Sequence, residues 1–350
     1  MHKGVIYALL AAILFGTSTP FAKTFIGHIA PVILAGLLYL GSGIGLLIWY
    51  AIRKVLSGNV SREVIGLTRA DLPWLGAAII SGGIAGPVLL MTGLALTPAS
   101  SASLLLNMEG VLTAMLAWFV FKENFDRRIF IGMLFIVAAG ILLSWEQVPV
   151  FGVPWGAIAI LAACFCWAMD NNFTRQISAG DAVEIAGIKG LVSGTVNLSI
   201  GIGLGFSLPD IGTVLTTGAL GFSGYGLSLV LFVLALRHLG TARTGAYFSA
   251  APFVGAALSL MLLGESPSMT FWLAAFLMGL GIYLHLTEHH SHWHEHEVME
   301  HAHSHTHDSH HQHVHEEPWD GQEPHTHTHR HEPIKHKHPH YPDIHHRHTH

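Results

Sequence analysis

The stretch "LLNMEGVLTAMLAWFVFKEN" at residues 105–124 matches "YFSAAPFVGAALSLMLLGES" at residues 247–266, which lies 142 positions further along the chain. The match places Glu123 on Glu265 at the end of an apolar run in each copy. A similar apolar segment with a similar ending, found twice at a fixed spacing, is typical of an internal duplication. The sequence therefore predicts that the body of the chain consists of two repeats.

A second match supports the duplication near the start of each repeat. At a spacing of 152, "FGTSTPFAK" (residues 15–23) lies over "WAMDNNFTR" (residues 167–175), which pairs Lys23 with Arg175. We interpret these two bases as anchors at the membrane interface, because a long basic side chain can bury its stem and keep its charge in water.

The composition indicates a membrane protein, because 51% of the residues are hydrophobic and 11% are charged. A bilayer core is crossed by roughly 20 apolar residues in a helix. Cutting the body at charges, prolines and glycine clusters gives ten predicted spans, at residues 4–26, 30–52, 72–96, 98–121, 128–145, 153–177, 182–206, 211–236, 240–263 and 268–287. The predicted fold class is an all-α polytopic membrane protein.

The expected topology is inverted, because five helices per repeat leave the second copy upside down. Of the 13 Lys and Arg residues between 1 and 288, eleven fall on the side of the N-terminus. Basic loops stay cytoplasmic, so we expect both termini in the cytoplasm and, in a bacterium, the plasma (inner) membrane as the location. The predicted repeats are residues 1–146 and 147–288.

Residues 289–350 form a tail of different composition, with "HAHSHTHDSHHQHVH" at residues 301–315, 24 of the 28 histidines and a net charge of −6. Because it has no aliphatic run to bury, we expect a disordered cytoplasmic tail. Neutral imidazole is a common ligand for transition metals, so we expect Ni, Co, Zn or Cu on the tail, bound by His294, His296, His301, His303, His305, His307, His310, His311, His313, His315, His325, His327, His329 and His331. No cofactor is expected for the body.

The ten spans, the inverted halves and the repeat endings "FKE" and "LGES" resemble the drug/metabolite transporter superfamily, in particular its EamA family. The resemblance covers residues 4–287 and implies a ten-helix transporter with a central cavity that exports amino acids, other metabolites or xenobiotics. The family pattern has a proline thirteen residues before the closing glutamate; Pro252 keeps it, whereas the first repeat has Gly110, preceded by Glu109.

Glu109 is the strongest candidate for the transport pathway. An ionised side chain near the middle of a span costs about 2.5–3.5 kcal/mol unless it faces a cavity or a partner. Glu109 therefore either lines the substrate path, where it accepts a proton or coordinates a cation, or joins helices. Asn107 and Met108 flank Glu109, and we assign Asn107 to the same pathway. The thioether of Met108 is more typical of an apolar core than of a metal site.

A polar group in the sixth span, formed by Asp170, Asn171 and Asn172, lies at a depth similar to that of Lys189 in the seventh. An ion pair between Asp170 and Lys189 is sterically reasonable, with a structural or a functional role. Such a pair would leave Glu109 as the carboxylate free to change protonation.

The sequence contains no nucleophile elbow, phosphate-binding loop or HExxH motif, so an enzyme is not expected. Three functions remain. The leading one is a secondary exporter of divalent transition metals, which the tail would collect. The second is an EamA-type exporter of an amino acid, metabolite or drug, with the tail as a metal store or regulator. The third is a membrane-tethered metal-binding or sensing module. The expected partners are a small solute or metal ion and the lipid bilayer, without nucleic acid, and a homodimer is left open.

Overall fold

The structure of the protein is a computed structural model. It describes residues 2–56, 67–121, 127–146, 153–177, 181–239, 241–286, 291–295, 299–305, 325–331 and 335–339. The chain divides into two units, Met1–Glu288 and His289–His350, and each is described by itself below.

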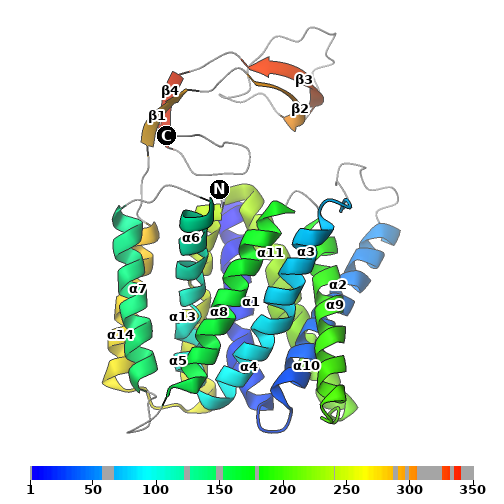
Figure 1. Ribbon diagram of the computed structural model, residues 1–350, viewed down its shortest axis with the longest axis vertical. Coiled ribbons are helices and arrows are strands. Elements are labelled where there is room, and N and C mark those ends of the chain that lie inside the picture. The colour runs from blue at the N-terminus through cyan, green and yellow to red at the C-terminus, as the bar shows by residue number, and fades with distance from the viewer. Residues whose placement is uncertain are drawn as a thin grey trace. The chain divides into compact units, whose positions relative to one another are not determined.

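Helices make up the regular structure of the first unit (Figure 1). Its α-helices are α1 (His2–Phe25), α2 (Pro31–Leu56), α3 (Leu72–Ala78), α4 (Gly86–Leu96), α5 (Ala99–Leu105), α6 (Met108–Phe121), α7 (Arg127–Glu146), α8 (Trp155–Gln176), α9 (Ala182–Gly203), α10 (Ile211–Gly221), α11 (Ser228–Leu239), α12 (Thr241–Phe248), α13 (Ala251–Leu263) and α14 (Met269–Leu286). Two π-helical segments, η1 (Ile79–Ala85) and η2 (Phe222–Leu227), connect α3 to α4 and α10 to α11.

Seven helices among the described residues are long and apolar enough to cross a membrane. Three shorter apolar helices, Phe130–Trp145, Ala251–Leu263 and Met269–Leu284, lie where further spans were expected. Exposed apolar side chains such as Trp145, Ile80 and Met269 give the unit an outer surface suited to lipid. The structure therefore agrees with a polytopic helical membrane protein, and the total of ten crossings stays a prediction.

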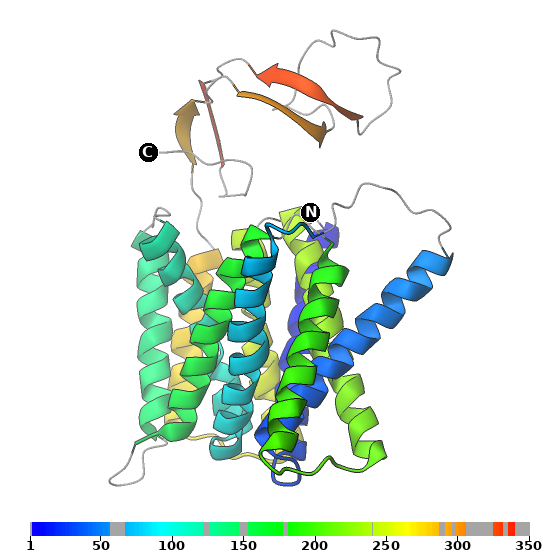
Figure 2. The same cartoon turned by 45° about the vertical axis from the view of Figure 1, so that its right-hand side comes forward.

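Helix boundaries recur at the spacing of the sequence match. Helix α5 begins at Ala99 and α12 at Thr241, and α7 begins at Arg127 and α14 at Met269; each pair is 142 residues apart. The two π segments also occupy corresponding positions. In Figures 1 and 2, α1 and α8 begin at opposite ends of the first unit.

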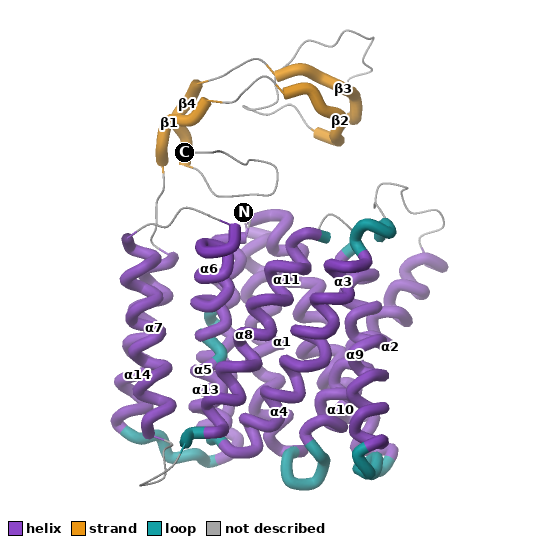
Figure 3. Tube along the Cα trace, in the orientation of Figure 1, coloured by secondary structure: helices purple, strands orange, loops and turns teal. Residues whose placement is uncertain are grey.

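Two helices that the sequence predicts to be continuous are interrupted part-way along the bundle (Figure 3). Span 98–121 is divided into α5 and α6, and span 240–263 into α12 and α13. At the first break, the N–H of Asn107 donates to the Leu104 carbonyl at 3.0 Å, a tighter turn than the α-helix makes. At the second, Pro252 lies in the first turn of α13, where a missing N–H is tolerated. Discontinuous helices are typical of transporter sites.

Glycines bring corresponding helices of the two repeats close together. A Cβ on Gly43 of α2 would lie 2.3 Å from the Leu191 nitrogen of α9, and one on Gly190 would lie 2.6 Å from the Gly43 nitrogen. Gly201 and Gly205 form a GxxxG motif, a spacing typical of close helix packing, but only Gly201 packs against another helix. Gly201 lies against Ile33, whereas Gly205 follows the end of α9 with φ 86°, and a Cβ at this position would meet no atom within 4 Å.

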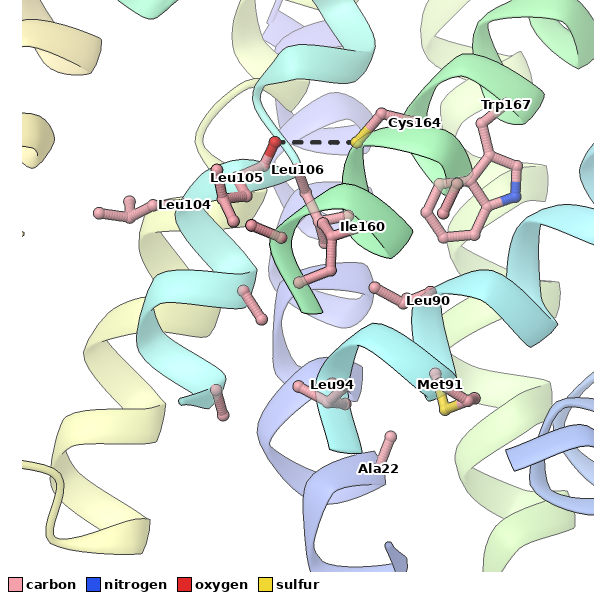
Figure 4. Packing of buried hydrophobic residues seen from close by; sticks show 14 of the residues in the cluster. Ala22, Leu90, Met91, Leu94, Leu104, Leu105, Leu106, Ile160, Cys164 and Trp167 are labelled. Carbon is pink, nitrogen blue, oxygen red and sulfur yellow. Dashed lines mark hydrogen bonds between the residues drawn. The ribbon is translucent and has the colours of Figure 1, made fainter. Parts of the chain in front are cut away.

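The buried core of the first unit joins α4, α5 and α8. Figure 4 shows Leu90, Leu94 and Ile160 between these helices, with Cys164 directed toward the Leu105 carbonyl. The Cys164 sulfur lies 3.7 Å from that oxygen, and the side chain is fully buried. Cys164 is therefore a core cysteine.

The second unit contains four strands, β1 (Ser291–Glu295), β2 (Met299–His305), β3 (His325–His331) and β4 (Lys335–Pro339). Strand β1 pairs with β4 and β2 with β3, both antiparallel. The register places His301 opposite His329 and His303 opposite His327. These segments differ from the expectation of a tail without regular structure, because their period-two alternation of histidine with other residues suits a strand.

Candidate transport pathway

The interrupted helix α5–α6 places Glu109 in the first turn of α6. The Asn171 side-chain amide of α8 donates a hydrogen bond to Glu109 Oε1 at 2.8 Å and lies 3.4 Å from Thr113 Oγ1. A helix N-terminus carries partial positive charge and suits a nearby carboxylate. The broken helix of the first repeat and the first helix of the second repeat thus share one polar contact.

This polar contact is accessible, since Glu109 is partly exposed and Asn171 is exposed. Facing a carboxylate to hydrocarbon costs about 2.5–3.5 kcal/mol, and such groups in transmembrane helices almost always face the bundle interior or water. The accessible side of Glu109 and Asn171 therefore suits a polar passage better than a lipid contact.

The predicted ion pair of Asp170 with Lys189 is present. Lys189 Nζ lies 2.5 Å from Asp170 Oδ1 and 2.7 Å from Oδ2, and the side chains of Lys189 and Asp170 are 7% and 11% exposed. Thr174 Oγ1 also donates to Asp170 Oδ1 at 2.8 Å. The pair joins α8 to α9, and because each charge is matched, neither is left alone in the bundle.

The ion pair packs directly on the π segment η1. A Cβ on Gly82 would lie 2.0 Å from Asp170 Oδ2, so only glycine leaves room for the carboxylate there. The Gly82 carbonyl accepts hydrogen bonds from Tyr39 OH and from Trp167 Nε1, both at 2.9 Å. One backbone oxygen is thus fixed by α2 and α8 at once, and π segments are frequently found at functional sites.

An aromatic cluster connects the same region to the second interrupted helix. Phe15 lies 6.1 Å from Trp167, 5.7 Å from Tyr225 and 5.6 Å from Phe248, measured between ring centroids. Tyr225 belongs to η2, and Phe248 is the last residue of α12. Tyr39 extends the cluster at 5.4 Å from Tyr225. Aromatic side chains from both repeats therefore meet in one cluster, which reaches the α12–α13 break at Phe248.

The structure does not gather all the predicted pathway residues. Asn172 is buried and donates to the Ala168 carbonyl of its own helix at 2.8 Å. Asn107 is buried at the α5–α6 break, and its amide lies 3.7 Å from the Met278 sulfur of α14. Successive helical residues point in different directions, so Asp170, Asn171 and Asn172 make three separate sets of contacts instead of one polar group.

Metal ligands are sparse in the described part of the chain, where no group of three or more His, Cys, Asp or Glu side chains is placed to hold an ion. Eight of the histidines predicted to bind metal lie in strands β1, β2 and β3, namely His294, His301, His303, His305, His325, His327, His329 and His331. The remaining ones, His296, His307, His310, His311, His313 and His315, lie outside the described residues.

Four residues of this region are not indicated as site residues by the sequence analysis, namely Tyr39, Gly82, Trp167 and Tyr225. The sequence does contain a pattern that indicates Gly82 and Tyr225. Each lies in a glycine-rich segment, "SGGIAGP" at 81–87 or "GFSGYG" at 221–226, and these segments coincide with the π segments. Their equivalent placement in the two repeats points to Gly82 and Tyr225. Aromatic side chains in an apolar helix carry no comparable signal.

Comparison with known proteins adds the following similarities. The EamA-like transporter family matches the chain at residues 2–145 and 154–287. A protein named "Uncharacterized transporter" from Methanothermobacter thermautotrophicus is 27% identical over 297 residues, covering 80% of this chain and 85% of its own length. A "Probable amino-acid metabolite efflux pump" from Salmonella typhimurium is 25% identical over 304 residues, covering 81% and 95%.

Two further similarities agree with these. The "Uncharacterized inner membrane transporter YedA" of Escherichia coli K12 is 25% identical over 281 residues, covering 77% of this chain and 86% of its own length. A solved crystal structure has a similar fold, with a TM-score of 0.59 and 20% identity over 79% of this chain and 94% of its own length.

Proposed function

The chain belongs to the EamA-like transporter family, and on that premise we propose that it is a secondary exporter of a small organic solute. The family match and the relatives named as transporters indicate that the chain is an integral inner membrane protein and a transporter, not an enzyme. The observation that carries the pathway is the hydrogen bond of Asn171 to Glu109 at 2.8 Å, which joins the two repeats at a broken helix.

The proposed pathway uses the two helix breaks. Inverted repeats with discontinuous helices place a substrate site near the middle of the membrane and expose it alternately to the two sides. Glu109 offers a carboxylate for an ammonium group or a proton, and the cluster of Phe15, Trp167 and Phe248 offers aromatic faces. This combination suits a solute with one polar or cationic end and one apolar end, the kind of cargo that the Salmonella relative's name implies.

Export of a bare divalent metal, which the histidine tail favours, has less support from the body. A dication normally needs several carboxylate, imidazole or thiolate ligands. In the part of the chain that the structure describes, Asp170 is engaged by Lys189, which leaves Glu109 as the candidate carboxylate of the pathway. Metal as the exported solute is therefore our second candidate.

Metal binding by the tail stays part of the proposal, as a store or regulator. The strand register supports it, because His305 lies opposite His325 and His294 opposite His336, in addition to the two pairs described above.

The experiment that separates these functions is uptake into inside-out vesicles with an imposed pH gradient. Labelled amino acids and the ions Ni, Co and Zn are offered in parallel to the intact chain and to a chain cut after Glu288. Organic uptake that survives the cut supports the proposal. Metal uptake without organic uptake would replace it with the metal exporter.

A further inference from the structure

The linker between α4 and α5 is held from both sides by opposite charges. Lys23 of α1 donates to the Leu94 carbonyl and, at 2.9 Å, to the Thr97 carbonyl at the end of α4. Glu265, which follows α13, accepts from the Ala99 N–H at 2.7 Å and the Ser100 N–H at 2.9 Å. The ammonium group of Lys23, which the sequence predicts to be an anchor at the membrane interface, thus also binds the end of α4.

The contact of Glu265 crosses from one repeat to the other. Ala99 and Ser100 belong to the first repeat and lie 166 and 165 residues before Glu265. The residue preceding α5 is Pro98, which supplies no side-chain cap, so the first two N–H groups of this helix depend on Glu265. Gly264, with φ 65°, turns the chain so that the carboxylate follows directly after α13.

The N–H groups that Glu265 binds lie in a buried part of this region, although Pro98 of the linker is exposed. Ala99, Ser100 and Thr97 are 0%, 3% and 2% exposed. A Cβ on Gly156 of α8 would lie 2.3 Å from Thr97 Oγ1, so the second repeat covers the linker from another direction as well.

We propose that Glu265 is a positioning residue that holds this end of the bundle closed, and that transport requires its bonds to α5 to break and re-form. The proposal rests on the transport function proposed above. An alternating-access transporter must open its two ends in turn, and α5 is the half of a broken helix that lies at this end (Figures 1 and 3). Release of Glu265 separates the repeats at the linker and leaves the two N–H groups to water.

The energetics favour a switch over a permanent bond. The two bonds to one carboxylate are charge-assisted and strong when dry, yet water can replace the partner of each N–H once the linker is exposed. Loss of one hydrogen-bond partner at a dry site shifts the equilibrium between the closed and the open arrangement by about tenfold. Glu265 is itself partly exposed, so solvent reaches the carboxylate in the closed arrangement.

The test measures how accessible position 100 is to a thiol reagent, so it does not depend on knowing the transported solute. Ser100→Cys is introduced into a chain carrying Cys164→Ala and Cys166→Ala, and labelling by a membrane-impermeant thiol reagent is followed in intact cells. We expect Glu265→Gln to raise the labelling rate about tenfold. The matched control is Asp210→Asn, which removes a carboxylate that caps α10 within its own repeat. Equal labelling in Glu265→Gln and the control, with both proteins folded by size-exclusion profile, would overturn the proposal.

A second measurement keeps the proposal open to refutation if Glu265→Gln fails to fold. A short bifunctional thiol reagent is applied in vesicles to the pair Ser100→Cys and Ser266→Cys, which keeps the Glu265 carboxylate, and uptake is measured before and after. We expect the crosslink to stop uptake and a reducible reagent to restore it after reduction. Unchanged uptake in the crosslinked protein contradicts the closing role, whereas absence of uptake in the parent chain contradicts the proposed transport function and leaves the labelling result intact.

Discussion

The Asn171 amide and the Glu109 carboxylate meet at 2.8 Å, and this single hydrogen bond joins the first helix of the second repeat to the broken helix of the first. Neither residue belongs to the dry core, because Asn171 is exposed and Glu109 partly so. Under the proposed function, an accessible polar contact between the two repeats is well placed to be broken by the transported solute.

Replacing Asn171 with Ala should weaken transport without unfolding the protein. The change removes one charge-assisted hydrogen bond, worth about 1.5–3 kcal/mol when buried and less at this accessible site. We expect apparent KM to rise severalfold with a melting temperature near that of the parent. Asn172→Ala is the informative comparison, because Asn172 contacts its own helix. An equal effect of the two changes on KM would count against a pathway role for Asn171.

Asp170→Asn should destabilise the protein strongly, by about 3–5 kcal/mol, because it leaves the Lys189 ammonium buried without its charge partner. The double variant Asp170→Asn with Lys189→Met removes both charges and should regain most of that loss. Thermal unfolding in detergent measures both. A double variant no more stable than Asp170→Asn would show that the cost has another origin.

Gly82→Ala should reduce both stability and transport, since the new Cβ would lie 2.0 Å from Asp170 Oδ2 and displace it from Lys189. Overpacking of this kind costs about 1–3 kcal/mol. The matched control is Gly76→Ala in α3, where no atom lies within 4 Å and the helix gains a better former. We expect the control to melt at or above the parent temperature, and a similar loss in both would refute the packing argument.

Asp210 caps α10, and the contribution of this cap to the stability of the protein has a predictable pH dependence. Hydrogen bonds from Thr213 Oγ1 and from the Thr213 N–H lower the pKa of this exposed carboxyl from its ordinary value. Because the folded pKa lies below the unfolded one, the cap stabilises the protein above the unfolded pKa, and its contribution is lost as the pH falls through the folded pKa. Asp210→Asn should therefore lower the melting temperature slightly at pH 7 and leave it unchanged at a pH below the folded pKa of Asp210. A pH-independent difference between the two proteins contradicts this origin.

Much of the architecture could be predicted from residue types alone, because a helix that faces lipid must satisfy its backbone internally and be apolar over a fixed length. The apolar runs and the repeat spacing located the helices of the first unit. The Asp170–Lys189 pair was also predictable, since two opposite charges at similar depth in adjacent spans have few other ways to avoid an unpaired charge.

The α5–α6 break and the cap by Glu265 could not be predicted from local sequence, whereas Pro252 marks the position of the α12–α13 break. Asn107 occurs in an apolar stretch whose composition predicts a continuous helix, and its side chain contacts Met278, which lies 171 residues further along the chain. The sequence marks Glu265 only as the end of a repeat. Its partners, Ala99 and Ser100, offer backbone N–H groups, which leave no trace in the identity of side chains.

The most direct test of the central claim compares Glu109→Gln with Glu184→Gln, the same chemical change in the first turn of α9. Inside-out vesicles receive the solute identified by the uptake experiment described above, and both gradient-driven uptake and solute exchange without a gradient are measured. We predict that Glu109→Gln loses gradient-driven uptake and keeps exchange, while Glu184→Gln keeps both. Gradient-driven uptake by Glu109→Gln at the parental rate would contradict a pathway through the broken helix.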